Sequence, residues 1–327
     1  VLTVQKNMAA IGHDTEAVQA TNDAYNNLHG CCKYERTFGV KNSCVENCTK
    51  PCCKDKVKKA CCSSKAVKTS CATKKFKDIS YTEHHDLKPL KLNVFTPKSS
   101  KKELKDVIIF IYGGNWNSGN KDMYGFMGRQ FGKEDIVTVI PNYTLSPNAN
   151  FDTMAQQVTK AITWTYNTIE TYGGNPERIF ITGHSAGAHL AALATMSPKY
   201  KGETSKIKGI ILNDAAGLDM YSYLKENPPK EEPDNYVTSW TTNPKLWKEA
   251  SPLYHIDTET PPIFTYLGTK TYNSIIEGNR IFREELLKVQ PEAKLIKLDK
   301  KHVPMIVQYF YPWNNRAKEI KAFMNAN

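Results

Sequence analysis

The stretch RIFITGHSAGAHLAALATM (Arg178–Met196) decides the fold of this 327-residue chain. RIFITG is a continuous apolar run, which predicts a strand buried on both faces, and HLAALATM predicts a helix directly after it. Between them lies Gly183-His184-Ser185-Ala186-Gly187, a G-x-S-x-G motif in which a sharp strand-to-helix turn exposes the serine side chain. The N-terminal end of the helix favours negative charge at that point. We therefore expect Ser185 to be a nucleophile of acyl transfer; the alternative is an incidental serine in a glycine-rich turn.

Strands and helices alternate over the rest of the chain from Phe76 onward. Such alternation requires a mostly parallel sheet with helices on both faces. We therefore predict an α/β domain over residues 76–327. The other predicted strands are residues 77–81, 90–97, 107–112, 136–143, 207–214, 261–268 and 293–299, and a helix is predicted at 152–172.

Residues 1–75 have a different composition and are interpreted as a separate N-terminal segment. A helix is predicted within the first 30 residues, and all nine cysteines follow between Cys31 and Cys71. Between Cys31 and Lys77 there are 13 Lys and Arg residues against 3 Asp and Glu, whereas the whole chain has a net charge of +11. The rest of the chain is therefore nearly neutral.

The cysteines are interpreted as disulfide-forming, because disulfides let a short segment with few apolar residues hold a shape. Metal binding is the alternative, since Cys44, Cys48 and Cys52 recur at helical spacing. No pair of CxxC motifs and no histidine occurs in this segment, which disfavours zinc. Disulfides persist only in oxidising compartments, so we expect a secreted, periplasmic or cell-surface protein. The sequence starts at Val1 rather than Met, so any signal peptide has been removed or left out, which is consistent with export but does not prove it. No apolar run approaches the roughly 20 residues that cross a bilayer.

The basic charge of residues 31–77 could attract an acidic glycan or an anionic surface, but a merely solvated basic face is the favoured interpretation. Nucleic acid is not expected as a partner. The segment has only three aromatic residues, Tyr34, Phe38 and Phe76, too few for a surface on which bases stack.

The loop Tyr112-Gly113-Gly114-Asn115-Trp116 ends the strand predicted at 107–112, where donors for an oxyanion should lie. Its two glycines free the backbone to turn N–H groups toward a substrate. We expect the donors to be the N–H groups of Gly114 or Asn115, together with that of Ala186. A plain turn is the alternative.

Together these residues resemble a known group of enzymes. The YGGNW loop, GHSAGAHLAAL, WKEASPLYHI (Trp247–Ile256) and a late histidine resemble esterases of the hormone-sensitive-lipase and feruloyl/acetyl-xylan-esterase type, and most of all the BD-FAE group. The likeness covers roughly residues 76–327 and implies an α/β-hydrolase fold. That group usually has histidine where Tyr112 stands and a small residue where Asn115 stands. The backbone donors survive both changes, which bear on the loop's hydrogen bonding and the room for substrate.

The resemblance implies a serine carboxylic-ester hydrolase that needs no cofactor and no metal. Its substrate would be a small-molecule ester or one linked to a polysaccharide, with acetyl or feruloyl esters of plant polysaccharide as the finer expectation. The rival hypothesis is a binding protein on a hydrolase scaffold, with the basic Cys-rich segment as its binding module. Four aromatic residues either line an acyl pocket or belong to the core: Trp116, Tyr143, Trp240 and Trp247.

His302 is the expected general base. It follows the last predicted strand, and the order Ser185 then His302 is the order of this class of hydrolases. His184 lies inside the turn, His189 on the following helix and His255 in a structural loop, so all three are poorer candidates.

The acidic member of the triad is the open question. The resemblance places it in a Gly-x-x-Asp context after the strand predicted at 261–268, where this chain has Gly268-Thr269-Lys270-Thr271. Thr271 can hydrogen-bond an imidazole but cannot stabilise an imidazolium, and loss of the carboxylate lowers kcat by about 10⁴. Asp214, at the end of the preceding strand, is the first candidate. Asp219, which in this family often caps a helix, is the second, and the absence of any carboxylate is the third.

Overall fold

The computed structural model describes residues 6, 9–10, 18–26, 73–82, 89–98, 103–200, 202–229, 235–311 and 313–327. The chain divides into two units, Val1–Cys71 and Ala72–Asn327. In the first unit the helix α2 (Asn22–Asn26) is described, within the range where a helix was expected. The nine cysteines lie outside the described residues, and so do the predictions of disulfides and metal binding that rest on them. The prediction of glycan contact rests on residues 31–77, of which residues 73–77 are described.

The second unit is built on one sheet, and it begins slightly earlier than residue 76, because Thr73 already pairs with Pro97. Its strand order is β1-β2-β4-β3-β5-β6-β7-β8. β2 pairs antiparallel with both β1 and β4, and every other neighbouring pair in this order is parallel. The strands are β1 (Thr73–Ser80), β2 (Lys91–Pro97), β3 (Lys105–Ile111), β4 (Val137–Pro141), β5 (Gly174–His184), β6 (Ile207–Asn213), β7 (Ile263–Gly268) and β8 (Lys294–Leu298).

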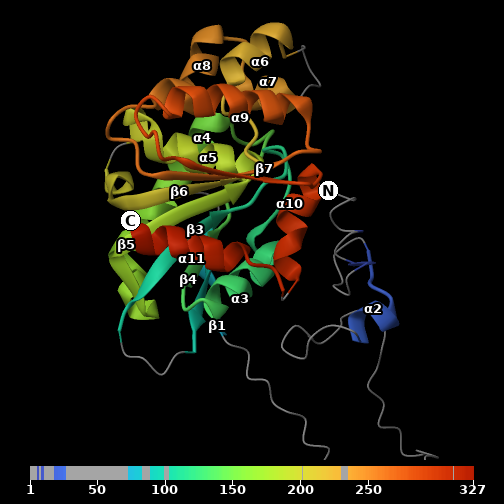
Figure 1. Ribbon diagram of the computed structural model, residues 1–327, viewed down its shortest axis with the longest axis vertical. Coiled ribbons are helices and arrows are strands. Elements are labelled where there is room, and N and C mark those ends of the chain that lie inside the picture. Colours follow the sequence, from blue (N-terminus) through green and yellow to red (C-terminus); the bar gives the residue numbers. More distant parts are fainter. Residues whose placement is uncertain are drawn as a thin grey trace, which may run out of the picture. The chain divides into compact units, whose positions relative to one another are not determined.

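Helices cover both faces of this sheet, as the alternation of elements predicted. Figure 1 shows α3 and α11 on one face and α4, α5 and α9 on the other. The helices of this unit are α3 (Gly125–Lys133), α4 (Phe151–Thr168), α5 (Ala186–Met196), α6 (Met220–Glu226), α7 (Asn235–Trp240), α8 (Pro244–Glu249), α9 (Asn273–Leu286), α10 (His302–Val307) and α11 (Arg316–Ala326). Short 3₁₀ helices are η3 (Lys121–Tyr124), η4 (Ile169–Tyr172), η5 (Pro198–Tyr200), η6 (Glu203–Lys206), η7 (Pro252–His255) and η8 (Gln308–Phe310).

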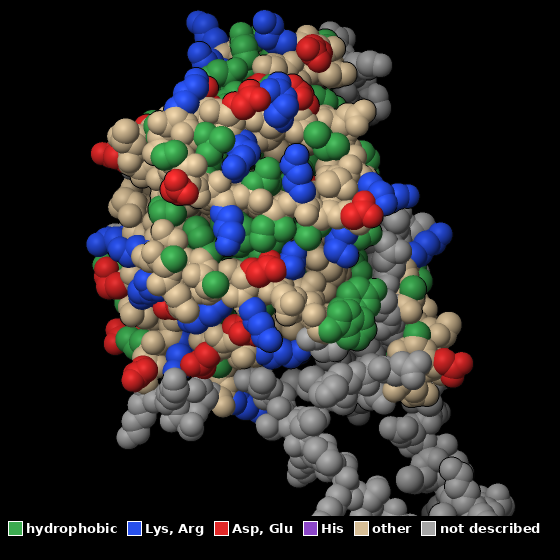
Figure 2. Space-filling model, viewed as in Figure 1, with side chains coloured by type: hydrophobic (Ala, Val, Ile, Leu, Met, Phe, Trp, Pro, Cys, Tyr) green, Lys and Arg blue, Asp and Glu red, His purple; other side chains and the backbone are tan. Residues whose placement is uncertain are grey.

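The core lies at the centre of the sheet. The apolar run Val107–Ile111 in β3 is at most 1% exposed, as expected of a parallel strand covered on both faces. Helix α5 is apolar all round and is buried from Ala186 to Ala194, which is why its sequence lacks a polar stripe. None of the described helices is long and apolar enough to span a bilayer. On the face shown in Figure 2, basic and acidic side chains are interspersed, in keeping with a nearly neutral domain.

Register places the ends of three central strands side by side. The Ser185 N–H donates to Asn213 O at the end of β6 (3.2 Å), and the Asp214 N–H donates to Tyr266 O in β7 (2.8 Å). The residues that follow β5 and β6 are therefore fixed next to one another at the carboxyl edge of the sheet, where open α/β sheets bind their ligands.

Candidate active site

Ser185 stands at the turn between β5 and α5, where the sequence predicted it. Its backbone has φ 56° and ψ −125°, a conformation that costs an L residue about 1–3 kcal/mol. A methyl group on Gly187 would lie 2.1 Å from Ile111 O, and one on Gly183 would lie 2.4 Å from the carbonyl carbon of Gly187. Both flanking positions therefore accept only glycine, and this close packing holds the strained turn.

The structure brings Ser185, His302 and Asp214 together. Ser185 Oγ lies 2.8 Å from His302 Nε2, and His302 Nδ1 lies 2.6 Å from Asp214 Oδ2. His302 begins α10 just after β8, and Asp214 directly follows β6. With the Ser185 hydroxyl donating to Nε2 and Nδ1–H donating to the carboxylate, a proton can pass from the serine to the histidine.

The carboxylate of Asp214 is fully buried and accepts three hydrogen bonds. Oδ1 accepts from the N–H of Gly268 (2.8 Å), while Oδ2 accepts from Thr271 Oγ1 (2.6 Å) and from His302. These donors compensate for the lost hydration of a buried charge. Thr271, in the slot where the resemblance placed the acid, is thus a donor to the carboxylate on the neighbouring strand.

Asp219, the second candidate acid, has a different role. Its Oδ1 accepts from the N–H of Ser222 (3.1 Å), so it caps the N-terminus of α6. This is the helix-capping role that the sequence suggested for it, and its carboxylate is not hydrogen-bonded to His302 in the described structure.

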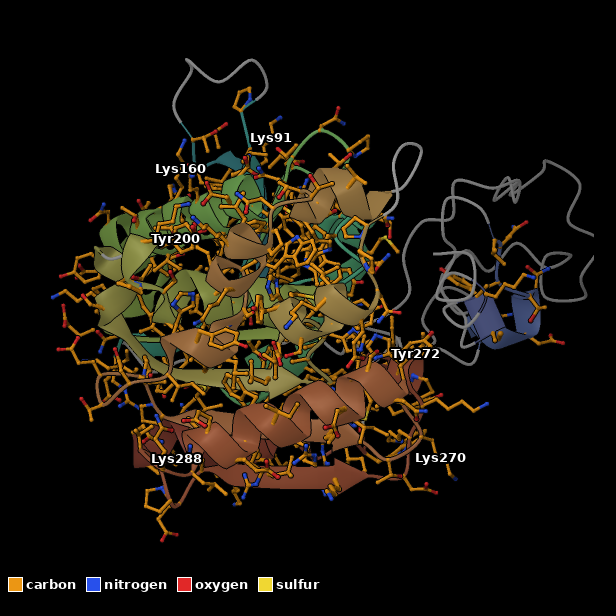
Figure 3. The ribbon with its side chains drawn as sticks, turned by 90° about the horizontal axis from the view of Figure 1, so that it is seen from above. Lys91, Lys160, Tyr200, Lys270, Tyr272 and Lys288 are labelled. Carbon is orange, nitrogen blue, oxygen red and sulfur yellow. The ribbon has the colours of Figure 1, made fainter. Side chains whose placement is uncertain are left out.

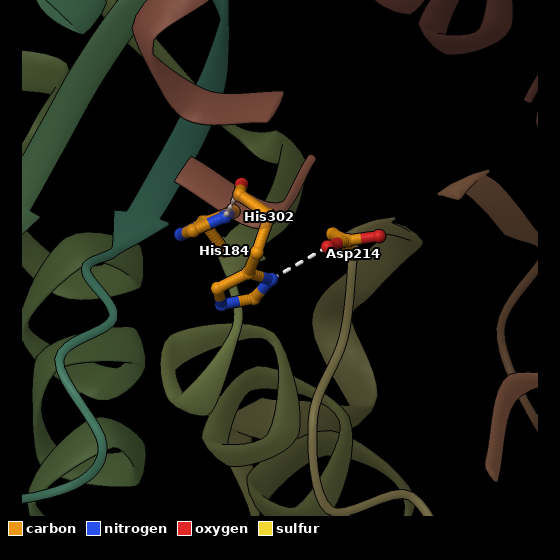
Figure 4. A group of neighbouring side chains, drawn as sticks. All are labelled: His184, Asp214 and His302. Carbon is orange, nitrogen blue, oxygen red and sulfur yellow. Dashed lines mark hydrogen bonds and ion pairs between the residues drawn. The ribbon is translucent and has the colours of Figure 1, made fainter. Parts of the chain in front are cut away.

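His184 completes a cluster with His302 and Asp214, in which one potential ligand atom from each residue lies within 4.8 Å of the others (Figure 4). The three have the composition of a metal site, but their ligand atoms already hydrogen-bond. His184 Nε2 donates to the carbonyl of His302 (3.1 Å), and Asp214 and His302 bind each other. Burial, with a smaller effect of the adjacent His302, lowers the pKa of His184 to about 3. His184 is therefore a neutral donor that fixes the backbone of His302.

The expected oxyanion loop lies against the nucleophile turn. A methyl group on Gly113 would lie 2.5 Å from the carbonyl of His184 and 3.0 Å from Ser185 Cβ. Asn115 has φ 51° and Trp116 φ 58°, so the loop is in a left-handed conformation just beyond that contact. Ala186 is the first residue of α5, and N–H groups of the first turn have no partner within their helix. The roles of Gly114, Asn115 and Ala186 as oxyanion donors stay predictions.

Tyr112 anchors this loop from one side. Its ring stacks on Tyr143 (centroids 4.7 Å apart) and on Tyr124 (5.7 Å), and the hydroxyl of Tyr143 donates to the carbonyl of Tyr112 (2.9 Å). The tyrosine that replaces the family's usual histidine thus has its own packing and hydrogen bonding.

Trp116 anchors the loop from the other side. Its Nε1 donates to His189 Nδ1 (3.2 Å), and His189 Nε2 donates to the carbonyl of Ala250 (2.8 Å). His189 can accept this bond because burial lowers its pKa to about 4 and keeps it neutral. No sequence pattern indicates the pair, since its members lie 73 residues apart.

The four aromatic residues considered for an acyl pocket are core residues. Each is at most 5% exposed, and Trp116 and Trp240 contact each other edge to face with centroids 4.7 Å apart. The residues are Trp116, Tyr143, Trp240 and Trp247.

Tyr272 is an aromatic residue of the site that the sequence did not indicate. It is 63% exposed, and its ring centroid lies 5.3 Å from that of His302. Figure 3 shows Tyr272 at the N-terminal end of α9, with Lys288 just beyond the other end of the same helix. The histidine of the triad therefore has an exposed aromatic ring beside it.

A hydrogen-bonded serine, histidine and aspartate at the carboxyl edge of a mostly parallel sheet, with the serine on a strand-to-helix elbow, define an α/β-hydrolase. The chain belongs to the BD-FAE family, whose model matches residues 92–283. This confirms the resemblance drawn from the sequence.

Among curated relatives, the probable isoprenylcysteine alpha-carbonyl methylesterase ICMEL1 of Arabidopsis thaliana is 27% identical over 235 residues, which is 67% of this chain and 49% of the relative. Esterase LipQ of Mycobacterium tuberculosis is 33% identical over 175 residues, 50% of this chain and 41% of the relative. The chain thus spans about half the length of the curated relatives it matches.

Solved structures share the fold. Thermogutta terrifontis esterase 2, phosphoramylated by tabun, superposes with a TM-score of 0.62 at 21% identity, covering 78% of this chain and 94% of that one. A truncated carbohydrate esterase from gut microbiota has a TM-score of 0.64 at 18% identity, covering 79% and 97%. The predicted α/β-hydrolase fold is therefore confirmed.

Proposed function

We propose that the chain is a serine carboxylic-ester hydrolase that acts through an acyl-enzyme on Ser185. The observation that carries the proposal is the unbroken hydrogen-bonded path from Ser185 Oγ through His302 to the buried Asp214, on a strained elbow. Several relatives are named as esterases or methylesterases, which supports this class of reaction.

In the first half of the reaction, Ser185 Oγ attacks the ester carbonyl carbon while His302 Nε2 takes the hydroxyl proton. Asp214 stabilises the resulting imidazolium, and the N–H groups of Ala186 and of Gly114 or Asn115 face the oxyanion. The tetrahedral intermediate collapses, the C–O bond to the alcohol breaks, and His302 gives its proton to the alcohol.

In the second half, water attacks the acyl-enzyme and His302 acts again as the base. The carboxylic acid leaves and Ser185 recovers its proton. Every proton in this cycle is held by Ser185, His302, the water or the products, so the mechanism we propose uses no cofactor or metal.

Two departures from the family pattern, Thr271 in the position of the acid and Tyr112 in the position of a histidine, would favour a non-catalytic binding protein. In both cases other residues supply the missing role. Asp214 Oδ2 lies 2.6 Å from Nδ1 of His302, so it takes the place of a carboxylate at position 271. The stacking of Tyr112 on Tyr143 supports the oxyanion loop. The rival hypothesis is therefore the weaker one.

For the substrate, we propose a small-molecule or polysaccharide-linked ester, with acetyl or feruloyl groups of plant polysaccharide as the acyl part. The resemblance to feruloyl and acetyl-xylan esterases supports this choice, and so does the fold shared with a carbohydrate esterase. The basic residues 31–77 would hold the enzyme near an acidic glycan or surface, outside the cytoplasm. Retention of the full chain on polygalacturonate at low salt and its release at high salt would support that contact; equal passage at both would refute it.

The activity is tested with 4-nitrophenyl acetate on the wild type and on Ser185→Ala, with Ser205→Ala as the matched control. Ser205 is an exposed serine on η6 whose hydroxyl donates to the nearby carbonyl of Gly202 (2.8 Å). We expect turnover in the wild type and the control and background hydrolysis in Ser185→Ala. Treatment with paraoxon should phosphorylate Ser185 alone, and mass spectrometry of the proteolytic peptides would detect the modified residue. A wild type no faster than Ser185→Ala on acetyl, butyryl and feruloyl esters would refute the proposal.

A further inference from the structure

Two neighbouring strands deliver a side chain to the same nitrogen of His302. Asp214 directly follows β6, and Thr271 lies in the turn after β7, which pairs with β6 in parallel. Thr271 Oγ1 lies 2.6 Å from Asp214 Oδ2 and 3.3 Å from His302 Nδ1. The hydroxyl therefore completes a three-membered contact with the acid and the base.

The donor directions in this contact follow from the chemistry of the groups. An ionised carboxylate can only accept, so both of its close neighbours must donate to it. His302 Nδ1–H points to Asp214 at 2.6 Å and is therefore not free to accept from Thr271 at 3.3 Å. The hydroxyl hydrogen of Thr271 consequently goes to Asp214 Oδ2.

This bond fixes the carboxylate in orientation. Oδ1 is held by the N–H of Gly268, and Oδ2 is held by His302 and Thr271 together. Without the hydroxyl, the only donor to Oδ2 among the described contacts would be His302, the residue that Asp214 must itself orient. Rotation of the carboxylate about Cβ–Cγ would then be resisted only by the Gly268 N–H at Oδ1 and by His302 itself at Oδ2.

The turn that carries Thr271 is tied to the segment just before His302. The N–H of Thr269 donates to Leu298 O (2.8 Å), and the N–H of Lys270 donates to Lys300 O (3.1 Å). The hydroxyl therefore has a fixed position relative to the imidazole that Asp214 must meet.

We propose that Thr271 is a positioning residue of the triad, whose hydroxyl holds the Asp214 carboxylate in the orientation that aligns His302 with Ser185. It acts through Asp214 and has no role in substrate binding. The inference rests on the proposed esterase activity and adds a fourth residue to its machinery.

The test is a double-variant cycle read by kcat and KM on 4-nitrophenyl acetate. Thr271→Val removes the hydroxyl at nearly constant volume, and Thr271→Ser keeps it. A hydrogen bond to a charged group corresponds to about a tenfold change in rate or more, so Thr271→Val should lower kcat about tenfold with KM unchanged. Thr271→Ser should recover most of the loss. Combined with Asp214→Asn, Thr271→Val should lower kcat no further, because residues that act as one unit are not additive.

Folding is checked by thermal unfolding of each variant. If valine at position 271 prevents folding, Thr271→Ala replaces it and the comparison with Thr271→Ser stays the same. A wild-type kcat in the hydroxyl-free variant overturns the inference and leaves the esterase standing. Equal losses in the Asp214 and the Asp214→Asn backgrounds also overturn it, because Thr271 would then act independently of the acid. If the wild type is no faster than Ser185→Ala, the esterase proposal itself fails, and the inference fails with it.

Discussion

Two buried histidines make this fold sensitive to mild acid. His184 donates to the carbonyl of His302, and His189 accepts from Trp116 and donates to Ala250, so both are built in as neutral rings. Burial is the main cause that lowers their pKa values from 6.5 to about 3 for His184 and to about 4 for His189. Changing the pH from 7 to 5 is therefore a perturbation whose effect on stability can be worked out.

The sign follows from proton counting. Between pH 6.5 and the folded pKa, the unfolded chain carries a proton on each histidine and the folded chain does not. Stability therefore falls as the pH is lowered through that window and does not depend on these groups above pH 6.5. At pH 5 each ring is about 1.5 pH units below its unfolded pKa, a loss of about 2 kcal/mol per histidine and of about 4 kcal/mol for both. Asp106, Asp122 and Asp152 have pKa values lowered from 3.8, so their contributions are lost only at lower pH.

The measurement is the free energy of unfolding in urea at pH 7 and pH 5. The informative variant is His189→Gln, since a glutamine amide can accept from Trp116 and donate to Ala250 without titrating. We expect the difference between the two pH values to fall from about 4 to about 2 kcal/mol. Thr195→Val, a non-titrating change on the same helix α5, should shift both values equally. A wild-type difference below about 1 kcal/mol, or one that His189→Gln leaves unchanged, would refute the reasoning.

Three further predictions concern the site. Gly187→Ala should lower the thermal midpoint, because overpacking of a close contact such as that with Ile111 O costs about 1–3 kcal/mol; an unaltered midpoint in calorimetry would contradict the contact. Asp219→Ala should cost about 1 kcal/mol of stability with kcat preserved, because it removes a helix cap. Asp214→Asn should lower kcat by about 10⁴. If the ester assay showed the large loss of kcat in Asp219→Ala and not in Asp214→Asn, the roles of the two aspartates would be exchanged. Asp214→Asn/Thr271→Asp should be about tenfold faster than Asp214→Asn alone, since residue 271 already reaches His302 Nδ1; equal turnover would show that a carboxylate there cannot serve the histidine.

The fold and two of the site residues follow from local sequence patterns. Ser185 is fixed by the motif between an apolar strand and an apolar helix, and His302 by its place after the last strand. The signals for Ser185 and for His302 are both local. Each residue follows a strand whose end can be recognised from its run of apolar residues.

The acid could be narrowed to candidates but not chosen from sequence, because the choice depends on which strand lies beside which. Asp214 and Asp219 both follow β6 within a few residues. Only the pairing of β6 with β7 and the donors at Gly268 and Thr271 single out Asp214. The partners of His184 and His189 lie 61 to 118 residues away along the chain, so their roles were equally hidden.

Backbone strain supplies evidence that neither composition nor motif could give. Seven non-glycine residues among the described ones have a positive φ, and four of them meet at this site: Asn115, Trp116, Ser185 and Asp214. Asparagine and aspartate tolerate the left-handed region, but tryptophan and serine adopt it at a cost that the surrounding packing must offset. Three loops from three adjacent parallel strands, β3, β5 and β6, carry this strain to one edge of the sheet. A fold selected for stability alone would relax such positions with glycine, so their concentration around Ser185 argues that the geometry is kept for chemistry.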